Sequence, residues 1–451
     1  MTVAAASRAP VAARRPLDRS AAMVRGAGLA LMLITLLAFG AAPWLGFTRS
    51  LAVVTLAGYV ATLVGTSYPA VGFLGIGVLC VLDAPARIYL LTGGLFRYNT
   101  LNYILLLVLV FGLTSVLRFR DVQTKLLLLL IVLLMVELLI SPDLAFGVQH
   151  VFNVVSLLGL QIYFQRAAAD RRTWIWFALT CGVAGAAGGF AFNLQQAVLP
   201  FANPNALAYF PLGAMFAVCL AFRFADEHAR VQLLLAMLAG INAVWVFLTA
   251  SRGSLLVATL CGLFLLLSTP SLSRRAVAMG CLAVLAIAVS SHFGNLQEVA
   301  VHRLEALVDP TRTLSSRTSG RSDLMLGGWY IFQDHPFGVG TGGFASAWAD
   351  LGRREGLSGF QEGVLFQAHA GWIKILAENG IPGVLLLVTF VLTFAVSGLR
   401  RQDRRLRLLG LFTTIVLTTA WISTEFQAKG LWLLVAGAIT LLRPGPERRA
   451  T

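Results

Sequence analysis

The chain has 451 residues, of which 58% are hydrophobic and only 12% are charged, and its mean hydropathy is +0.80. Soluble domains carry about a quarter of charged residues, so the composition excludes a soluble protein and predicts an all-α polytopic membrane protein. The net charge of +15 does not indicate nucleic-acid binding, because the arginines stand in short clusters between apolar runs, and such clusters report membrane orientation.

Apolar runs that approach the roughly 20 residues needed to span a bilayer recur along almost the whole chain. The candidate segments lie at 24–42, 50–66, 69–82, 100–117, 125–141, 150–165, 173–190, 203–222, 231–248, 253–268, 275–291, 380–398, 406–424 and 430–443. Three of them (50–66, 69–82 and 430–443) are short for a full span. The sequence therefore predicts 12–14 transmembrane helices.

Orientation follows from the basic residues, which are enriched in cytoplasmic loops. With the N-terminus in the cytoplasm, alternating spans bring the short arginine clusters to the cytoplasmic side and leave one large, partly helical periplasmic loop. The expected parts are a cytoplasmic tail at 1–23, a transmembrane bundle at 24–291, the periplasmic loop carrying the catalytic residues at 292–379, the final transmembrane helices at 380–443 and a cytoplasmic tail at 444–451.

Polar residues stand out in two of the earlier segments. Glu137 lies within a predicted span. Three roles are open for it: it serves a proton relay, it pairs with an arginine, or it packs against a neighbouring polar group. Asn203 and Asn205 flank Pro204 before another span, at the outer face. Their amides either cap the helix or donate hydrogen bonds to sugar hydroxyls or phosphate.

Arg252 lies between two apolar runs that leave no room for a loop, in Thr249-Ala250-Ser251-Arg252-Gly253-Ser254. By the predicted topology it lies at the outer membrane face. An arginine at this depth is costly unless it is paired or lines a wet cavity, and its planar group suits a pyrophosphate. The alternative is an arginine that reaches out to the lipid headgroups.

Within the long loop, Arg317 and Arg321 belong to a hydroxyl-rich turn at the start of a predicted helix. They form either an anion-binding site or part of a solvated loop. The helix is expected at 322–333, with Met325, Trp329 and Phe332 on one stripe, and Asp334-His335-Pro336 ends it. The glycine-rich run at 338–343 predicts a flexible turn, and residues 344–353 and 364–378 predict further helices.

His369 stands where the chain re-enters the membrane. It shares a helical face with Trp372, Ile373 and Leu376, which directs the imidazole toward other protein. A histidine in this position titrates near neutral pH and takes a proton from a hydroxyl. The alternative for a lone histidine is a structural or interfacial role.

Several motifs are missing from the sequence. It has no Walker motif, which argues against ATP-driven transport, and no outer Asp-x-Asp pair or His/Cys/carboxylate cluster with metal spacing. We therefore expect no metal and no cofactor. The cytoplasmic loops are too short for a catalytic domain, so a donor must already be in the membrane.

The chain resembles the bacterial O-antigen ligase and O-antigen or exopolysaccharide polymerase superfamily. The matching pieces are Phe201 to Ala208, Ser251-Arg252-Gly253, Ser319 to Trp329, Asp334 to Gly340, and His369 with Glu378 to Gly383. Their order and the large loop before the last spans match as well. Ala370 departs from the family, which commonly carries Asn there.

This resemblance implies a membrane glycosyltransferase of the GT-C type. Its donor is an undecaprenyl-pyrophosphate-linked glycan, and its acceptor is a glycan or lipid A–core, in a bacterial inner membrane. The resemblance maps the loop histidine onto His369 and the membrane-edge arginine onto Arg252, and it matches a loop arginine to Arg321. Metal-independent, inverting transfer is the expected chemistry.

Two other functions remain open from the sequence. A transporter or flippase for a lipid-linked oligosaccharide would have similar halves and broken helices, and no internal repeat is visible. A non-catalytic scaffold for envelope assembly would explain the spans but not an arginine at the depth of Arg252. Apart from the donor and acceptor, membrane lipids are the expected partners.

Overall fold

The computed structural model describes residues 17–82, 100–116, 121–167, 170–196, 204–225, 229–249, 251–269, 305, 321–355, 370–423 and 428–443. These residues form helices and no strand, as predicted. The predicted span at 275–291 lies outside them. Eight of the described helices are long and apolar enough to cross a membrane, and five shorter helices are also apolar.

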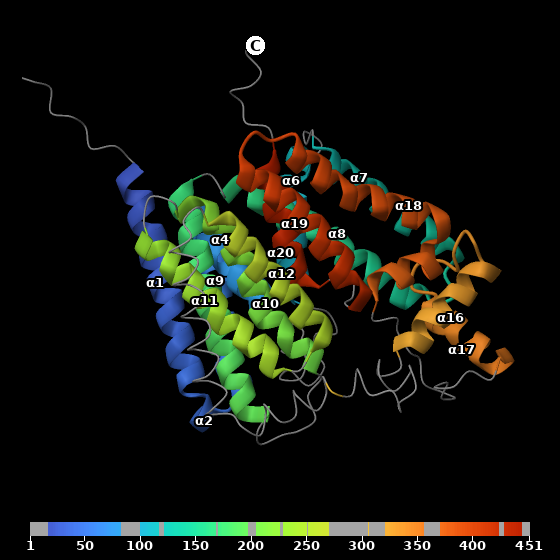
Figure 1. The fold of residues 1–451 in the computed structure, drawn as a ribbon, viewed down its shortest axis with the longest axis horizontal. Helices are drawn as coiled ribbons and strands as arrows, with labels where there is room; N and C mark the ends of the chain where they lie inside the picture. The colour runs from blue at the N-terminus through green and yellow to red at the C-terminus, as the bar shows by residue number, and fades with distance from the viewer. Residues whose placement is uncertain are drawn as a thin grey trace, which may run out of the picture.

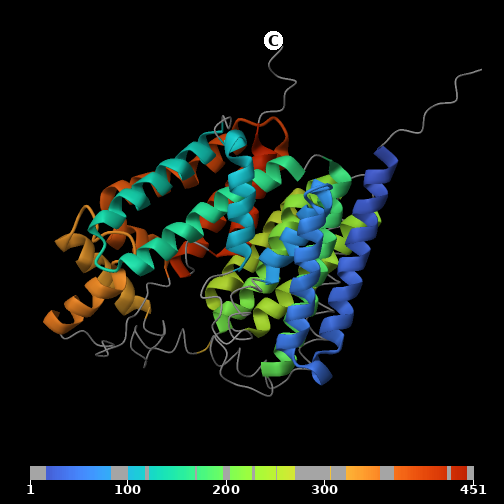
Figure 2. The same ribbon diagram turned by 180° about the vertical axis from the view of Figure 1, so that it is seen from behind.

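The helices form two neighbouring groups (Figures 1 and 2). The first group contains α1 (Leu17–Gly40), α2 (Ala42–Leu45), α3 (Phe47–Val64), α4 (Pro69–Leu82), α9 (Arg171–Gln196), α10 (Pro204–Ala221) with the 3-10 turn η2 (Phe222–Ala225), α11 (Ala229–Leu248) and α12 (Arg252–Ser268). The second contains α6 (Thr100–Val116), α7 (Val122–Glu137) with η1 (Leu138–Ile140), α8 (Leu144–Ala167), α18 (Gly371–Leu399), α19 (Arg404–Ser423) and α20 (Lys429–Leu442). The two groups meet where α10 packs on α20 and α12 on α19.

Large apolar side chains cover the outside of the described helices. Leu33, Leu63, Leu139 and Leu385 are each more than half exposed, which a soluble surface would not tolerate over so wide an area. Lipid tails are the solvent that such a surface requires. Inside, small residues allow close helix contacts, because the Cα atoms of Gly398 and Gly410 bring α18 and α19 together with no room for a side chain.

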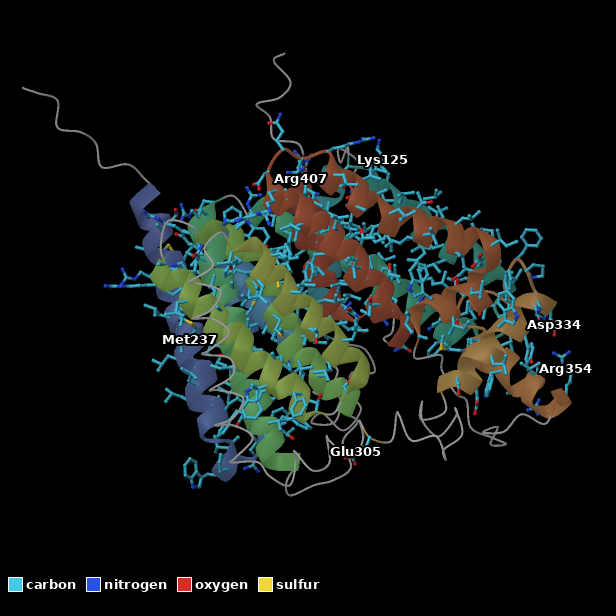
Figure 3. The ribbon with its side chains drawn as sticks, in the orientation of Figure 1. Lys125, Met237, Glu305, Asp334, Arg354 and Arg407 are labelled. Carbon is cyan, nitrogen blue, oxygen red and sulfur yellow. The ribbon has the colours of Figure 1, made fainter. Side chains whose placement is uncertain are left out.

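The basic clusters meet at one end of the molecule. Arg405 donates from Nε to Ser268 O (3.1 Å) and from Nη1 to Arg223 O (3.4 Å), which joins the start of α19 to the ends of α12 and η2. Arg443 likewise donates to Gln165 Oε1 (3.1 Å), near the ends of α20 and α8. Figure 3 shows Lys125 and Arg407 at this same end. We call it the basic end.

The loop helices α16 (Arg321–Asp334) and α17 (Phe344–Glu355) lie away from the basic end (Figure 1). Both were predicted, but the packed face of α16 was not. Met325 and Trp329 of the predicted stripe are 39% and 45% exposed. Trp348 and Ile373 instead pack closely against the glycines at 327 and 328. The pattern failed because glycine carries no apolar side chain, although its bare backbone admits a bulky neighbour.

Candidate functional site

The structure describes only some of the predicted site residues, and of those only the backbone. Asn203, Arg317 and His369 lie outside the described residues. Asn205, Arg252 and Arg321 lie in the first turns of α10, α12 and α16, and the structure describes only their backbone. The geometry of the site therefore rests on where these helices begin and on the residue that follows His369.

The N-termini of α10 and α12 lie at the same end of the molecule, as the directions of the two helices show. The helix α12 ends at Ser268, which contacts Arg405 at the basic end, and η2 after α10 carries Arg223, which contacts the same arginine. Both helices therefore begin at the opposite end, away from the basic cluster. The starts that carry Asn205 and Arg252 share that end.

The start of α18 lies there too, beside the end of α19. The indole N–H of Trp372 donates to Thr418 O at 3.0 Å, and the rings of Trp372 and Trp421 meet edge to face at 6.0 Å. Ala370, which precedes α18 and directly follows His369, is buried. The start of α18 is thus tied to the last turns of α19.

The start of α12 reaches the same level on another side of α19. The rings of Phe264 and Phe412 stack at 4.5 Å between the antiparallel helices α12 and α19. At about 1.5 Å per residue, Arg252 and Ser423 both lie roughly 17–18 Å beyond this contact. The starts of α12 and α18 therefore lie at the same end of the molecule, on two sides of α19.

The helix α18 is broken at Gly380, which has φ 56° and ψ −149°. In an unbroken helix the N–H of residue 381 and of residue 382 would bond to Ala377 O and Glu378 O. The break turns the first N–H away, and Pro382 has none to give. Two buried carbonyls of α18 are therefore left for other donors.

The segment 335–343 supplies these donors. The N–H groups of Val339 and Gly340 donate to the two carbonyls at 3.1 and 3.0 Å, and Pro336 O accepts from the N–H of Ile381 at 2.9 Å. The loop backbone thus completes the hydrogen bonds of the broken helix, as a buried helix end requires. We call residues 335–343 and 377–382 together the interlock.

The glycines of this segment are required by the interlock. Gly338, Gly340 and Gly342 all have positive φ (92°, 92° and 86°). A Cβ on Gly338 would lie 2.2 Å from Glu378 O, and one on Gly342 would lie 2.6 Å from Gly147 N. A turn is present here as predicted, but it is tightly packed, because this run lies between three other backbone segments.

Replacing Gly338 by alanine is expected to destabilise the protein clearly. The left-handed backbone costs an L-residue about 1–2 kcal/mol, and the new methyl group would also displace the carbonyl of Glu378. Thermal denaturation in detergent measures the effect. Gly262→Ala is the matched control, because that helical glycine has open space around it and alanine there favours the helix. Equal melting temperatures for both variants would contradict the interlock.

A buried polar network holds the interlock against α7. Asn379 donates from Nδ2 to Glu137 Oε2 and also lies 3.3 Å from Thr341 Oγ1. Thr341 in turn donates to Leu134 O at 3.0 Å. Of the three roles considered for Glu137, the contact with a neighbouring polar group is the one that this geometry supports.

An ion pair lies beside this network, in the first part of α18. Lys374 Nζ is 3.9 Å from Glu378 Oε1, which also accepts from the N–H of Phe344 at 3.3 Å. The same ammonium lies 3.5 Å from His150 Nδ1 and 5.1 Å from the Phe146 ring centre on α8. Both charged groups are at least 94% buried. The pair therefore joins α8, α17 and α18 through charged contacts inside the protein.

A second polar group continues along α8. Lys429 donates to Ser156 Oγ at 3.0 Å, and that hydroxyl lies 3.0 Å from Asn102 Oδ1. None of these three residues was predicted to be functional from the sequence, and Asn379 was named only as part of the matching piece Glu378 to Gly383. They could have been found in the sequence as a lysine, carboxylate or amide inside an apolar run, because burying such a group in a membrane costs free energy and such groups are commonly functional. Among the described residues, no three His, Cys, Asp or Glu side chains gather as a metal site.

Comparison with known proteins gives one family match. Residues 233–388 match the family model described as O-antigen ligase (Wzy_C), and no curated protein gives a significant match to the chain. The matched range includes Arg252, Arg321 and His369 and the whole interlock, and it leaves out Asn203 and Asn205. The resemblance to the O-antigen ligase and polymerase superfamily is thereby confirmed over residues 233–388 of this multi-pass helical membrane protein.

Proposed function

We propose that the protein transfers a glycan from undecaprenyl pyrophosphate to a sugar hydroxyl of an acceptor, at the periplasmic face of the bacterial inner membrane. The family match supports glycosyl transfer of the O-antigen ligase or polymerase type as the general activity. The observation that carries the finer proposal is the shared end at which α12 and α18 begin, on two sides of α19.

The proposed chemistry is a single displacement. His369 takes the proton of the acceptor hydroxyl, whose oxygen then attacks the anomeric carbon of the donor. The bond from this carbon to the pyrophosphate oxygen breaks, and the lipid pyrophosphate leaves with the electron pair. Arg252 and Arg321 stabilise the charge that develops on it, Arg317 adds to this anion site, and the anomeric configuration inverts.

The leaving group explains why so few protein groups are needed. A lipid pyrophosphate departs without a general acid or a metal when cationic side chains contact it. Asn203 and Asn205 are proposed to bind sugar hydroxyls or phosphate from the start of α10, which shares the end of α12. The fold we propose is GT-C-like, with both termini in the cytoplasm and the donor's lipid tail between helices.

Reconstitution in vesicles tests the proposal. The purified protein, a labelled lipid-pyrophosphate glycan and an acceptor are combined, and new glycosidic bonds are measured separately from movement of the donor across the bilayer. Transfer of label to the acceptor is the expected result. Donor movement without bond formation would instead support a flippase, and neither activity would favour a scaffold.

The surface of a deletion strain separates the two family activities. A ligase deletion leaves lipid A–core without attached glycan while long lipid-linked polymer accumulates. A polymerase deletion leaves single-repeat products or removes exopolysaccharide. Either phenotype is compatible with the proposed chemistry, because only the acceptor differs. An unchanged cell surface would contradict both.

A further inference from the structure

A polar groove lies on the loop helices, apart from the proposed reaction site. It has a volume of about 610 Å³ and runs between the end of η1, the segment 335–339 and the helices α16 and α17. Figure 3 shows Asp334 and Arg354 next to each other at this corner of the molecule. Pockets of roughly 300–1,000 Å³ hold compact organic ligands, so the groove accommodates a short oligosaccharide.

The walls of the groove differ in character. Its apolar part includes Ile140 and Val339, and its polar part comes from Asp334, His335, Ser346, Asp350 and Arg354. The guanidinium of the last residue lies 3.3 Å from the Asp334 carboxylate, so this pair connects α16 and α17. The pair is about half exposed, and its contribution to stability is small for that reason.

This combination suits a sugar. Carboxylate oxygens accept hydrogen bonds from neighbouring hydroxyl groups, and a guanidinium donates to ring and hydroxyl oxygens. The apolar wall covers the C–H face of a ring. Each carboxylate at the groove has its own guanidinium, Asp334 with Arg354 and Asp350 with Arg353, so these charges balance and the site suits an uncharged sugar.

The groove also has a fixed relation to the proposed reaction site. Its residue Val339 bonds to the carbonyl of Ala377, and about 10 Å of α18 separates Ala377 from Ala370, the neighbour of His369. A few sugar rings span such a distance. The interlock holds the groove and the start of α18 in one rigid arrangement.

We infer that this groove binds an internal stretch of an uncharged glycan, a few rings away from the sugar that reacts. The inference rests on the proposed function, since it takes the glycan substrate from it. Its role is to hold a long chain while the end of the chain reacts at the start of α18. Longer oligosaccharides therefore bind more tightly than single sugars.

Binding without turnover tests the inference. The full-length protein in nanodiscs is titrated with length-sorted neutral oligosaccharides, released from the surface polysaccharide of the cells that make it. Arg354→Ala is expected to weaken binding of the longer oligosaccharides about tenfold, the loss that one charged hydrogen bond implies. Arg353→Ala is the matched control, because its side chain has the same 60% exposure and pairs with Asp350 without lining the groove.

A second variant guards against an indirect effect. Ser346→Trp fills the groove with a side chain and is expected to remove the advantage of long over short oligosaccharides. Unchanged size-exclusion profiles confirm that both variants are folded. Equal affinities for all proteins, equal loss in Arg353→Ala, or no binding by the wild type would each overturn the inference. If the wild type transfers glycan but neither variant changes oligosaccharide binding, the inference about the groove is overturned and the proposed function stands. If oligosaccharides bind to the groove but no glycan is transferred, the proposed function is contradicted and the inference about the groove stands.

Discussion

Replacing His369 by alanine is expected to lower glycan transfer by a factor of about 10²–10⁴, the usual contribution of a general base. The acceptor hydroxyl would then have to lose its proton to water. The rate is measured in vesicles with a labelled lipid-pyrophosphate donor, at equal amounts of folded protein. His369→Gln is the companion variant, because glutamine keeps a polar side chain but takes no proton at neutral pH. It should be as inactive as the alanine variant.

Arg252→Ala tests the other half of the same mechanism. Loss of one group that stabilises the leaving charge costs about 10²–10³ in rate. Arg252→Lys should recover only part of the activity, because lysine keeps the charge but not the planar pair of donors. Arg353→Ala removes an exposed arginine from the loop helix α17 and is expected to transfer glycan normally. Wild-type rates in both the His369 and the Arg252 variants would refute the residue assignment.

Replacing Lys374 by methionine is expected to destabilise the protein by about 3–5 kcal/mol. The change leaves the carboxylate of Glu378, which is 0% exposed, without its ammonium partner. The melting temperature in detergent reports the loss. Because α18 begins directly after the His369 neighbour, transfer should also decline at temperatures where the wild type is still active.

The double variant Lys374→Met with Glu378→Gln is expected to recover most of this loss. It removes both charges, while the glutamine oxygen still accepts the hydrogen bond from the N–H of Phe344. Replacing buried pairs by neutral groups of similar size is often tolerated. Lys125→Met is the surface control, because Lys125 is exposed at the basic end. If the two single losses simply add in the double variant, the charges do not interact.

The sequence was sufficient for the helical architecture and for the loop helices. Long apolar runs and short basic clusters predict spans and their order, because each signal is local. The structure brings the arginine clusters around Arg223, Arg405 and Arg443 to one end, in agreement with the predicted alternation. The side of the membrane on which that end lies stays a prediction.

The interlock could not be predicted, because its contacts join residues far apart in the chain. Nothing local relates Glu137 to Asn379, or the glycines at 338–343 to the break in α18. A glycine looks the same in the sequence whether it lies in an exposed turn or packs tightly against another backbone segment. Only the three-dimensional structure shows which backbone lies next to it. The roles of His369 and Arg252 likewise remain predictions from the resemblance and from their chemistry.

The interlock also limits how relatives of this protein can be recombined. Its two halves, 335–343 and 377–382, satisfy one another's peptide groups through hydrogen bonds that no side chain provides. A chimaera that takes its loop from one parent and its last helices from another would retain these bonds only if both halves fit. Exchanging the two segments as a unit is therefore the sound design for such a chimaera.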